Sequence, residues 1–169
     1  MRMRHLLPVI GIVAVLAGIF LLRTGDEEVI RARLEELRTL AEIRTPESGI
    51  EPLGRARQLA GFFSEKTAYD FTSLGHGIRE FPSHAELTRT IARIRMKLAS
   101  LELALQDIQV HIEGDTARVR LRGTGLGTIR GEDGPFLEIH TAEIFLEKHD
   151  DTWLISGARH IRDERQQTE

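Results

Sequence analysis

The chain has 169 residues, of which 41% are hydrophobic, and a formal net charge of -3. This length allows one ordinary domain with its own core and is too short for two. The absence of cysteine excludes disulfides, thiolate catalysis and cysteine metal ligands.

The first 23 residues have the pattern of a membrane signal anchor. Arg2, Arg4 and His5 precede an uncharged run from Leu6 to Leu22, and Arg23 follows it. As a helix, these 17 residues would span about 25 Å, slightly less than a hydrocarbon core of roughly 30 Å. A cleaved signal peptide is the alternative, but the apolar run continues beyond the small residue Ala17. The basic start predicts a cytoplasmic N-terminus, with the rest of the chain outside the inner membrane, on the periplasmic side.

The sequence therefore divides into an anchor at 1–23, a domain at 24–162 and a polar tail at 163–169. Beyond the anchor, 20 basic residues stand against 26 acidic ones, a formal charge of -6. This balance argues against nucleic acid and anionic lipid as partners.

Three amphipathic helices are expected in the first part of the domain. Apolar residues recur at helical spacing over 26–43 and 53–63. Ser83 and Glu86 form a capping box that opens a third helix, whose apolar stripe continues to Leu101. A short extended segment at 67–73 precedes a loop with Gly75, Gly77 and Pro82.

The second half, from Leu105 to Ile161, predicts four strands and two hairpins. With a two-residue turn at Gly114 and Asp115, one register places all apolar side chains on one face. The apolar pairs are Ile112 with Ala117, Val110 with Val119, and Ile108 with Leu121; the polar pairs are His111 with Arg118, Gln109 with Arg120, and Asp107 with Arg122. A turn at Asp150 and Asp151, or a four-residue loop of the same register, pairs Lys148 with Trp153, Leu146 with Ile155, and Ile144 with Gly157.

Helices followed by a curved antiparallel sheet define an α+β fold class. The order of the elements, with Asp-Thr-Trp-Leu-Ile-Ser-Gly-Ala as the last strand, resembles the nuclear transport factor 2-like superfamily over about residues 26–161. This superfamily includes ketosteroid-isomerase-like and polyketide-cyclase-like proteins. The resemblance implies a cone of helices packed into a curved sheet, often with a cavity open at one end.

One group of polar residues is a candidate for chemistry. Glu138 and His140 share the parity of the core residues of their strand, and alternation along the last strand leads inward to Arg159. A carboxylate, an imidazole and a guanidinium on the concave side could bind a polar ligand or perform acid-base chemistry. The alternatives are a structural pair of Arg159 with Glu138, or a sheet end that is open to water.

The resemblance adds two further candidates for this pocket. Isomerase members of the superfamily use a tyrosine on the first helix and acidic residues on the sheet. Here the only tyrosine is Tyr69, outside the first helix, and only Asp70 could stand in for the sheet carboxylate. The missing helix tyrosine argues against steroid-type isomerisation.

Cofactor and metal sites are not predicted. The segment Gly123 to Thr128 is rich in glycine, but a turn and a strand follow it instead of the helix that a phosphate loop requires. The histidines show no HxH or H-E-x-x-H spacing. We therefore interpret the glycines as places where the sheet bends.

Two functions remain for the domain. The outer sheet face carries its own apolar residues, which favours a non-catalytic module that binds a small apolar ligand, pairs as a homodimer or meets an envelope protein. These interface candidates are Leu137, Ile139, Phe145 and Leu154. The alternative is an enzyme of isomerase, dehydratase or cyclase type. A deep cavity with converging polar groups would favour the enzyme, and a cavity filled by Phe62, Phe63 and Phe71 would favour the module.

Overall fold

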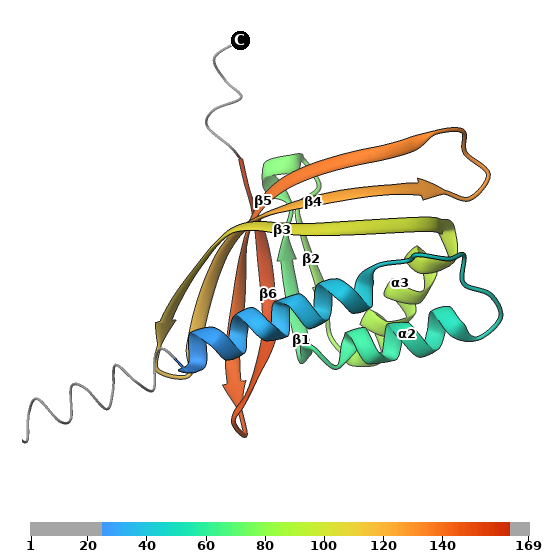
Figure 1. Cartoon of the computed structure of the whole chain (residues 1–169). Coiled ribbons are helices and arrows are strands. Elements are labelled where there is room, and N and C mark those ends of the chain that lie inside the picture. Colours follow the sequence, from blue (N-terminus) through green and yellow to red (C-terminus); the bar gives the residue numbers. More distant parts are fainter. Residues whose placement is uncertain (1–24, 163–169) are drawn as a thin grey trace, which may run out of the picture.

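The structure is a computed structural model that describes residues 25–162. A helix occupies residues 25–41, and Figure 1 shows it on the same side of the sheet as α2 and α3. The elements that follow are α2 (Glu51–Ala60), β1 (Phe63–Asp70), the 3-10 helix η1 (Thr72–Leu74), β2 (Ile78–Phe81), α3 (His84–Lys97), β3 (Leu98–Glu113), β4 (Thr116–Ile129), β5 (Pro135–His149) and β6 (Thr152–Ile161).

The six strands form one curved sheet in the order β2-β1-β6-β5-β4-β3. The α+β class is confirmed, but the sheet is mixed rather than antiparallel, because β1 runs parallel to β6. The chain between β1 and β6 contains α3 and four other strands, so no local turn signal could reveal this pairing.

The predicted starts of the helices agree better with the structure than their predicted ends do. The Ser83 hydroxyl caps α3 by accepting a hydrogen bond from the backbone N–H of Glu86 at 3.3 Å. The predicted helix through Leu101 is wrong, because α3 ends at Lys97 and Leu98 begins β3. From Leu101 to Leu105 the leucines alternate with other residues, a spacing of two that suits a strand. Ile78–Phe81, expected in a loop, forms β2.

The β3–β4 hairpin has the predicted register next to its turn. Five predicted pairs are observed in one continuous ladder: Glu113–Thr116 at the turn, Ile112–Ala117, His111–Arg118, Val110–Val119 and Gln109–Arg120. Beyond them, β3 carries one extra residue at a bulge where Asp107 has φ of 53°. Arg122 consequently faces Gln106, so the predicted pairs of Ile108 and Asp107 are wrong.

The bulge in β3 has a clear consequence for the core. It reverses the alternation, so that Leu101, Leu103 and Leu105 lie on the same side as Ile108 and Val110. A regular strand would have sent the three leucines to the outer face.

The β5–β6 hairpin also follows the prediction near its turn. Asp150 and Asp151 adopt left-handed φ values of 46° and 62°, as a tight two-residue turn requires. Lys148 faces Trp153 and Leu146 faces Ile155, but Ile144 faces Ala158 instead of Gly157. The cause is a second bulge: Ser156 is the extra residue of β6 between two paired positions.

The main core lies between helix 25–41 and the strongly curved part of the sheet. Its fully buried side chains are Ile30, Val119 and Trp153. Asp26 ties the start of this helix to the sheet, because it accepts hydrogen bonds from Trp153 Nε1 at 3.1 Å and Lys148 Nζ at 3.0 Å. Burial opposes ionisation of Asp26, but these two donors outweigh it and hold the pKa of the carboxyl below its usual value.

The free edge of β3 is covered by the segment that contains helix 25–41. Ile43 exchanges two backbone hydrogen bonds with Leu101, at 2.9 and 3.0 Å. The guanidinium groups of Arg31 and Arg38 donate to the carbonyl oxygens of Ile108 and Leu103. Covering an edge in this way prevents addition of another strand there.

The predicted membrane anchor at residues 1–23 and the polar tail at 163–169 lie outside the described residues. Within residues 25–162, no helix is both long and apolar enough to cross a membrane.

Candidate functional site

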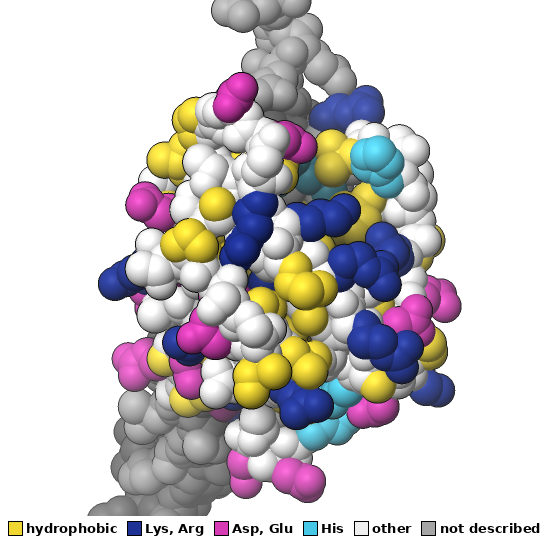
Figure 2. All heavy atoms as spheres, turned by 90° about the vertical axis from the view of Figure 1, so that its right-hand side faces the viewer, with side chains coloured by type: hydrophobic (Ala, Val, Ile, Leu, Met, Phe, Trp, Pro, Cys, Tyr) yellow, Lys and Arg dark blue, Asp and Glu magenta, His cyan; other side chains and the backbone are white. Residues whose placement is uncertain are grey.

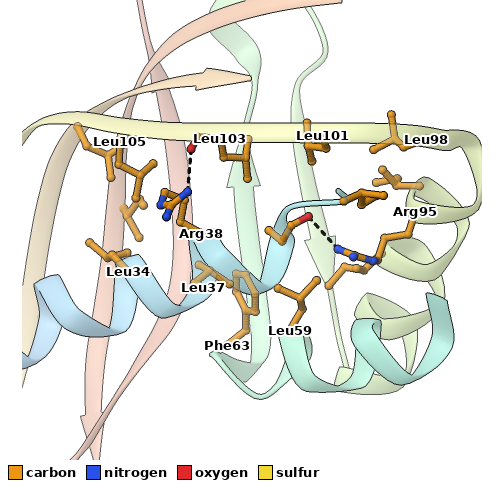
Figure 3. A pocket seen from close by; sticks show the side chains of 16 residues that line it. Leu34, Leu37, Arg38, Leu59, Phe63, Arg95, Leu98, Leu101, Leu103 and Leu105 are labelled. Atoms are coloured by element: carbon orange, nitrogen blue, oxygen red, sulfur yellow. Dashed lines mark hydrogen bonds between the residues drawn. The ribbon is translucent and has the colours of Figure 1, made fainter. Parts of the chain in front are cut away.

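The space between the helices and the sheet contains an apolar cavity of about 330 Å³ (Figure 3). Leucines from β3 line one side, and helix 25–41, α2 and α3 supply the others. The lining residues are Leu34, Leu37, Arg38, Ala41, Ile43, Leu59, Phe63, Ile91, Ile94, Arg95, Leu98, Leu101, Leu103, Leu105, Leu121 and Ile144. Gly125, opposite Leu103 on β4, has no side chain to compete for this space.

Two arginines belong to the lining, and both guanidinium groups are engaged in the wall. Arg38 donates to the Leu103 carbonyl at 3.0 Å, to Glu35 at 2.6 Å and also to Glu42. Figure 3 shows it directed to the backbone of β3. These contacts satisfy the charge of Arg38 without help from a ligand.

Arg95 is the second of these arginines and is only 4% exposed. Its guanidinium forms two hydrogen bonds with the Glu47 carboxylate, at 2.5 and 3.0 Å. It also donates to the carbonyl oxygens that end helix 25–41, with distances of 2.9 Å to Ala41, 3.4 Å to Leu40 and 3.3 Å to Glu42. A cation suits this place because the last carbonyls of a helix lack partners and carry partial negative charge.

The cavity reaches the surface near α3. Ile94 lines it and is also 53% exposed, and Met96 of the same helix is 54% exposed. Figure 2 shows the end of the molecule that is on the right in Figure 1, where apolar side chains reach the surface among those of lysine and arginine. This opening gives an apolar molecule a route into the cavity.

The three phenylalanines considered as a plug do not fill the cavity. Phe63 forms part of the wall, whereas Phe62 is 7% exposed and packs under the Arg33 guanidinium. Phe71 stacks on Tyr69 with ring centroids 6.2 Å apart.

Tyr69 and Asp70 point to different environments. Tyr69 belongs to an aromatic cluster with Phe63 and Phe81, and burial raises the pKa of its hydroxyl to about 12. Asp70 accepts a hydrogen bond from the Thr72 backbone N–H at 2.9 Å. The side chain and the backbone N–H of Thr72 lower the pKa of Asp70. Neither residue lines the apolar cavity.

The predicted group of Glu138, His140 and Arg159 is only partly assembled. Glu138 and His140 do meet, with 3.0 Å between Oε2 and Nε2. Arg159 instead pairs with Glu143 and lies over the Phe145 ring, at 5.7 Å from its centroid. The bulge at Ser156 reverses the alternation of β6, and therefore sends Arg159 to the opposite side of the sheet.

The same reversal brings His160 to His140. Its Nε2 lies 3.3 Å from Nδ1 of His140, and its Nδ1 lies 2.6 Å from the Ser73 hydroxyl of η1. Sequence reasoning missed both His160 and Ser73. The turn signals near them gave no indication, because the contact depends on the bulge and on the parallel pairing of β1 with β6.

The four interface candidates share the outer face of the sheet. Leu137 and Ile139 are 61% and 58% exposed, and Leu126 from β4 faces Leu137 and is 43% exposed. Phe145 and Leu154 lie farther along this face and are half-buried. Among residues 25–162, no three histidine or acidic side chains are grouped closely enough to hold a metal ion.

No protein-family model matches the chain. No curated protein matches it either. Similar solved structures include a protein with a nuclear transport factor 2-like, cystatin-like fold from Novosphingobium aromaticivorans, with 19% identity, 86% coverage of each chain and a TM-score of 0.59. A hexachlorocyclohexane dehydrochlorinase from Novosphingobium barchaimii has 13% identity, coverage of 82% of this chain and 87% of the other, and a TM-score of 0.58.

A third similar structure is a protein from Novosphingobium aromaticivorans that was proposed to be a scytalone dehydratase. It has 11% identity, covers 82% of this chain and 84% of its own, and has a TM-score of 0.66. Identities this low establish the fold alone. The chain therefore has the nuclear transport factor 2-like, cystatin-like α+β fold that the order of its elements suggested.

Proposed function

We propose that the domain is a module that binds a small apolar molecule in the cavity between helices and sheet, and that this cavity is not a catalytic site. The observation that carries this proposal is the lining: aliphatic and aromatic side chains surround about 330 Å³, and both arginines in the wall are already paired. A substrate there would meet no unengaged acid or base. The enzyme alternative is supported by the names of similar structures. However, Arg159 does not join Glu138 and His140 as the sequence suggested, because it lies on the other face of the sheet.

The cavity favours an uncharged ligand. Placing a polar group among leucines without a hydrogen-bond partner costs roughly 1–3 kcal/mol in proteins, and a charge costs far more. Its volume lies at the lower end of the usual range of about 300–1,000 Å³ for ligand pockets. A compact apolar molecule, such as one with two aromatic rings, is of suitable size.

Binding can be tested with N-phenyl-1-naphthylamine, a neutral fluorophore that brightens in apolar surroundings. We expect the full chain to bind it, and Leu37→Trp to weaken binding by at least about tenfold because the indole occupies the cavity. The control is Leu53→Trp, at a residue of α2 that is 39% exposed and does not line the cavity. Equal loss in both variants, or absence of binding by the unmodified chain, would contradict the proposal.

A second candidate function is self-association through the outer sheet face. It is favoured by the exposed neighbours Leu126, Leu137 and Ile139, because a monomer gains nothing from a contiguous apolar patch in water. An envelope protein is the other partner that this face could meet. We propose in addition that Leu6 to Leu22 hold the domain at the periplasmic side of the inner membrane.

Phe145→Glu tests self-association, because it places a charge within the proposed interface. We expect sedimentation to show a shift from dimer towards monomer, with little change in circular dichroism. Ile50→Glu is the matched control, since Ile50 is 85% exposed and lies before α2. A monomeric unmodified chain at high concentration would refute the dimer.

A further inference from the structure

Four side chains from three elements form an unbroken hydrogen-bonded chain outside the apolar cavity. Ser73 Oγ lies 2.6 Å from His160 Nδ1, His160 Nε2 lies 3.3 Å from His140 Nδ1, and His140 Nε2 lies 3.0 Å from Glu138 Oε2. Figure 1 shows η1, which carries Ser73, beside the end of β6 and near β5. These hydrogen bonds therefore join residues that are 87 and 20 positions apart in the sequence.

When both imidazoles are neutral, the hydrogen bonds among these four side chains have one consistent order of donors and acceptors. The Glu138 carboxylate can only accept, so His140 Nε2 carries a proton and donates it. Nδ1 of a neutral His140 is then an acceptor, and it receives the Nε2 proton of His160. Nδ1 of His160 is left as an acceptor for the Ser73 hydroxyl. Each of these groups then has a hydrogen-bond partner, and the Ser73 hydroxyl donates its proton to the basic Nδ1 of His160.

This arrangement has the features of an activated nucleophile. A hydroxyl and its base lie within about 2.6–3.2 Å in such sites, and a third group orients the base. Burial lowers the pKa of His160, and the charge of Arg162 adds to this effect, so the neutral imidazole that can accept a proton is favoured at neutral pH. The Ser73 hydroxyl also lies 3.1 Å from the His160 carbonyl, its acceptor when the ring is protonated.

We propose that Ser73 is the nucleophile of a Ser73–His160–His140–Glu138 relay that cleaves esters of small apolar acids. Phe71 and Leu74, at the two ends of η1, are 37% and 42% exposed and offer apolar contact for an acyl group. The Arg162 guanidinium donates to the Ser73 backbone carbonyl at 2.9 Å, which ties η1 to the end of β6.

The reaction balances with these groups and water. Ser73 Oγ bonds to the ester carbonyl carbon while its proton moves to His160 Nδ1. The bond from that carbon to the alcohol oxygen then breaks, and the departing alcohol takes the proton from Nδ1. Water attacks the acyl-serine in the same way, with its proton passing through His160 back to Ser73, and the acid is released. His140 and Glu138 act as positioning residues that hold the tautomer of His160.

The test is reaction of the full chain with a fluorophosphonate probe, in which a bond from Oγ to phosphorus forms and fluoride leaves. We expect mass spectrometry to locate the label on Ser73, and Ser73→Ala to abolish it. Ser156 is the internal control, because its Oγ lies 3.4 Å from the Phe145 carbonyl and has no imidazole beside it. His160→Gln should lower the labelling rate by at least about a hundredfold.

The pH dependence separates a relay from a merely structural cluster. Labelling should rise with pH as His160 loses its proton, with an inflection below the ordinary histidine value of about 6.5. Arg162→Gln should move this inflection upward, because it removes a positive charge that disfavours protonation of His160. Absence of label on Ser73 above that on Ser156, or labelling that is unchanged in His160→Gln, would overturn the proposal.

Discussion

Arg95→Met is expected to lower the free energy of unfolding by roughly 3–5 kcal/mol, a large part of the roughly 5–15 kcal/mol by which a typical domain is stable. Methionine fills much of the same volume but leaves the Glu47 carboxylate and the carbonyls of Leu40, Ala41 and Glu42 without their donor. Burying polar groups without partners is the cause of the loss. Urea denaturation followed by circular dichroism measures it.

Arg93→Met is the matched control, because Arg93 is an exposed residue of the same helix. Its effect should stay within about 0.5 kcal/mol. Adding Glu47→Leu to Arg95→Met should recover only part of the stability, since the backbone carbonyls remain without a donor. A loss below about 1 kcal/mol for Arg95→Met would show that water replaces the guanidinium easily.

Gly157→Ala is expected to lower the free energy of unfolding by about 1–3 kcal/mol. A Cβ at Gly157 would lie 2.5 Å from the backbone oxygen of Ala68, its parallel partner on β1. Because a backbone carbonyl cannot rotate away as a side chain does, β1 must shift relative to β6. Thermal unfolding of the variant measures the cost.

Gly125→Ala provides the comparison for Gly157→Ala. It also replaces a glycine within the sheet, but the nearest atom to its Cβ is the Leu103 side chain at 3.6 Å, an ordinary contact. We expect its effect to stay within about 0.5 kcal/mol. Equal losses for the two substitutions would show that backbone preference, and not close strand packing, decides the outcome.

Local patterns were sufficient for much of the fold. The capping box at Ser83, the turn at Gly114 and the aspartates at 150 and 151 each act over a few residues, so the sequence shows them directly. Alternation then extends the register away from each turn. This reasoning stays correct from Ile112 to Gln109 and from Lys148 to Leu146, and it ends at the first bulge.

The candidate site also contains one contact that the sequence predicts and another that depends on tertiary structure. Glu138 and His140 are two residues apart on one regular strand, so their contact could be predicted. Arg159 and His160 are adjacent, and only one of them can point to His140. The choice between them depends on a single extra residue in β6, which reverses every position that follows it.

The sequence by itself determined the α+β class, the positions of the turns and which residues alternate on each strand, because these depend on neighbours within a few residues. Tertiary structure decided the parallel pairing of β1 with β6, the bulges at Asp107 and Ser156 and the position of buried Arg95 at the end of helix 25–41. A bulge is stable only where packing on both faces gains more than the interrupted ladder loses. That balance involves segments far apart in the chain, and it fixed the leucine cavity and the partner of His140 together.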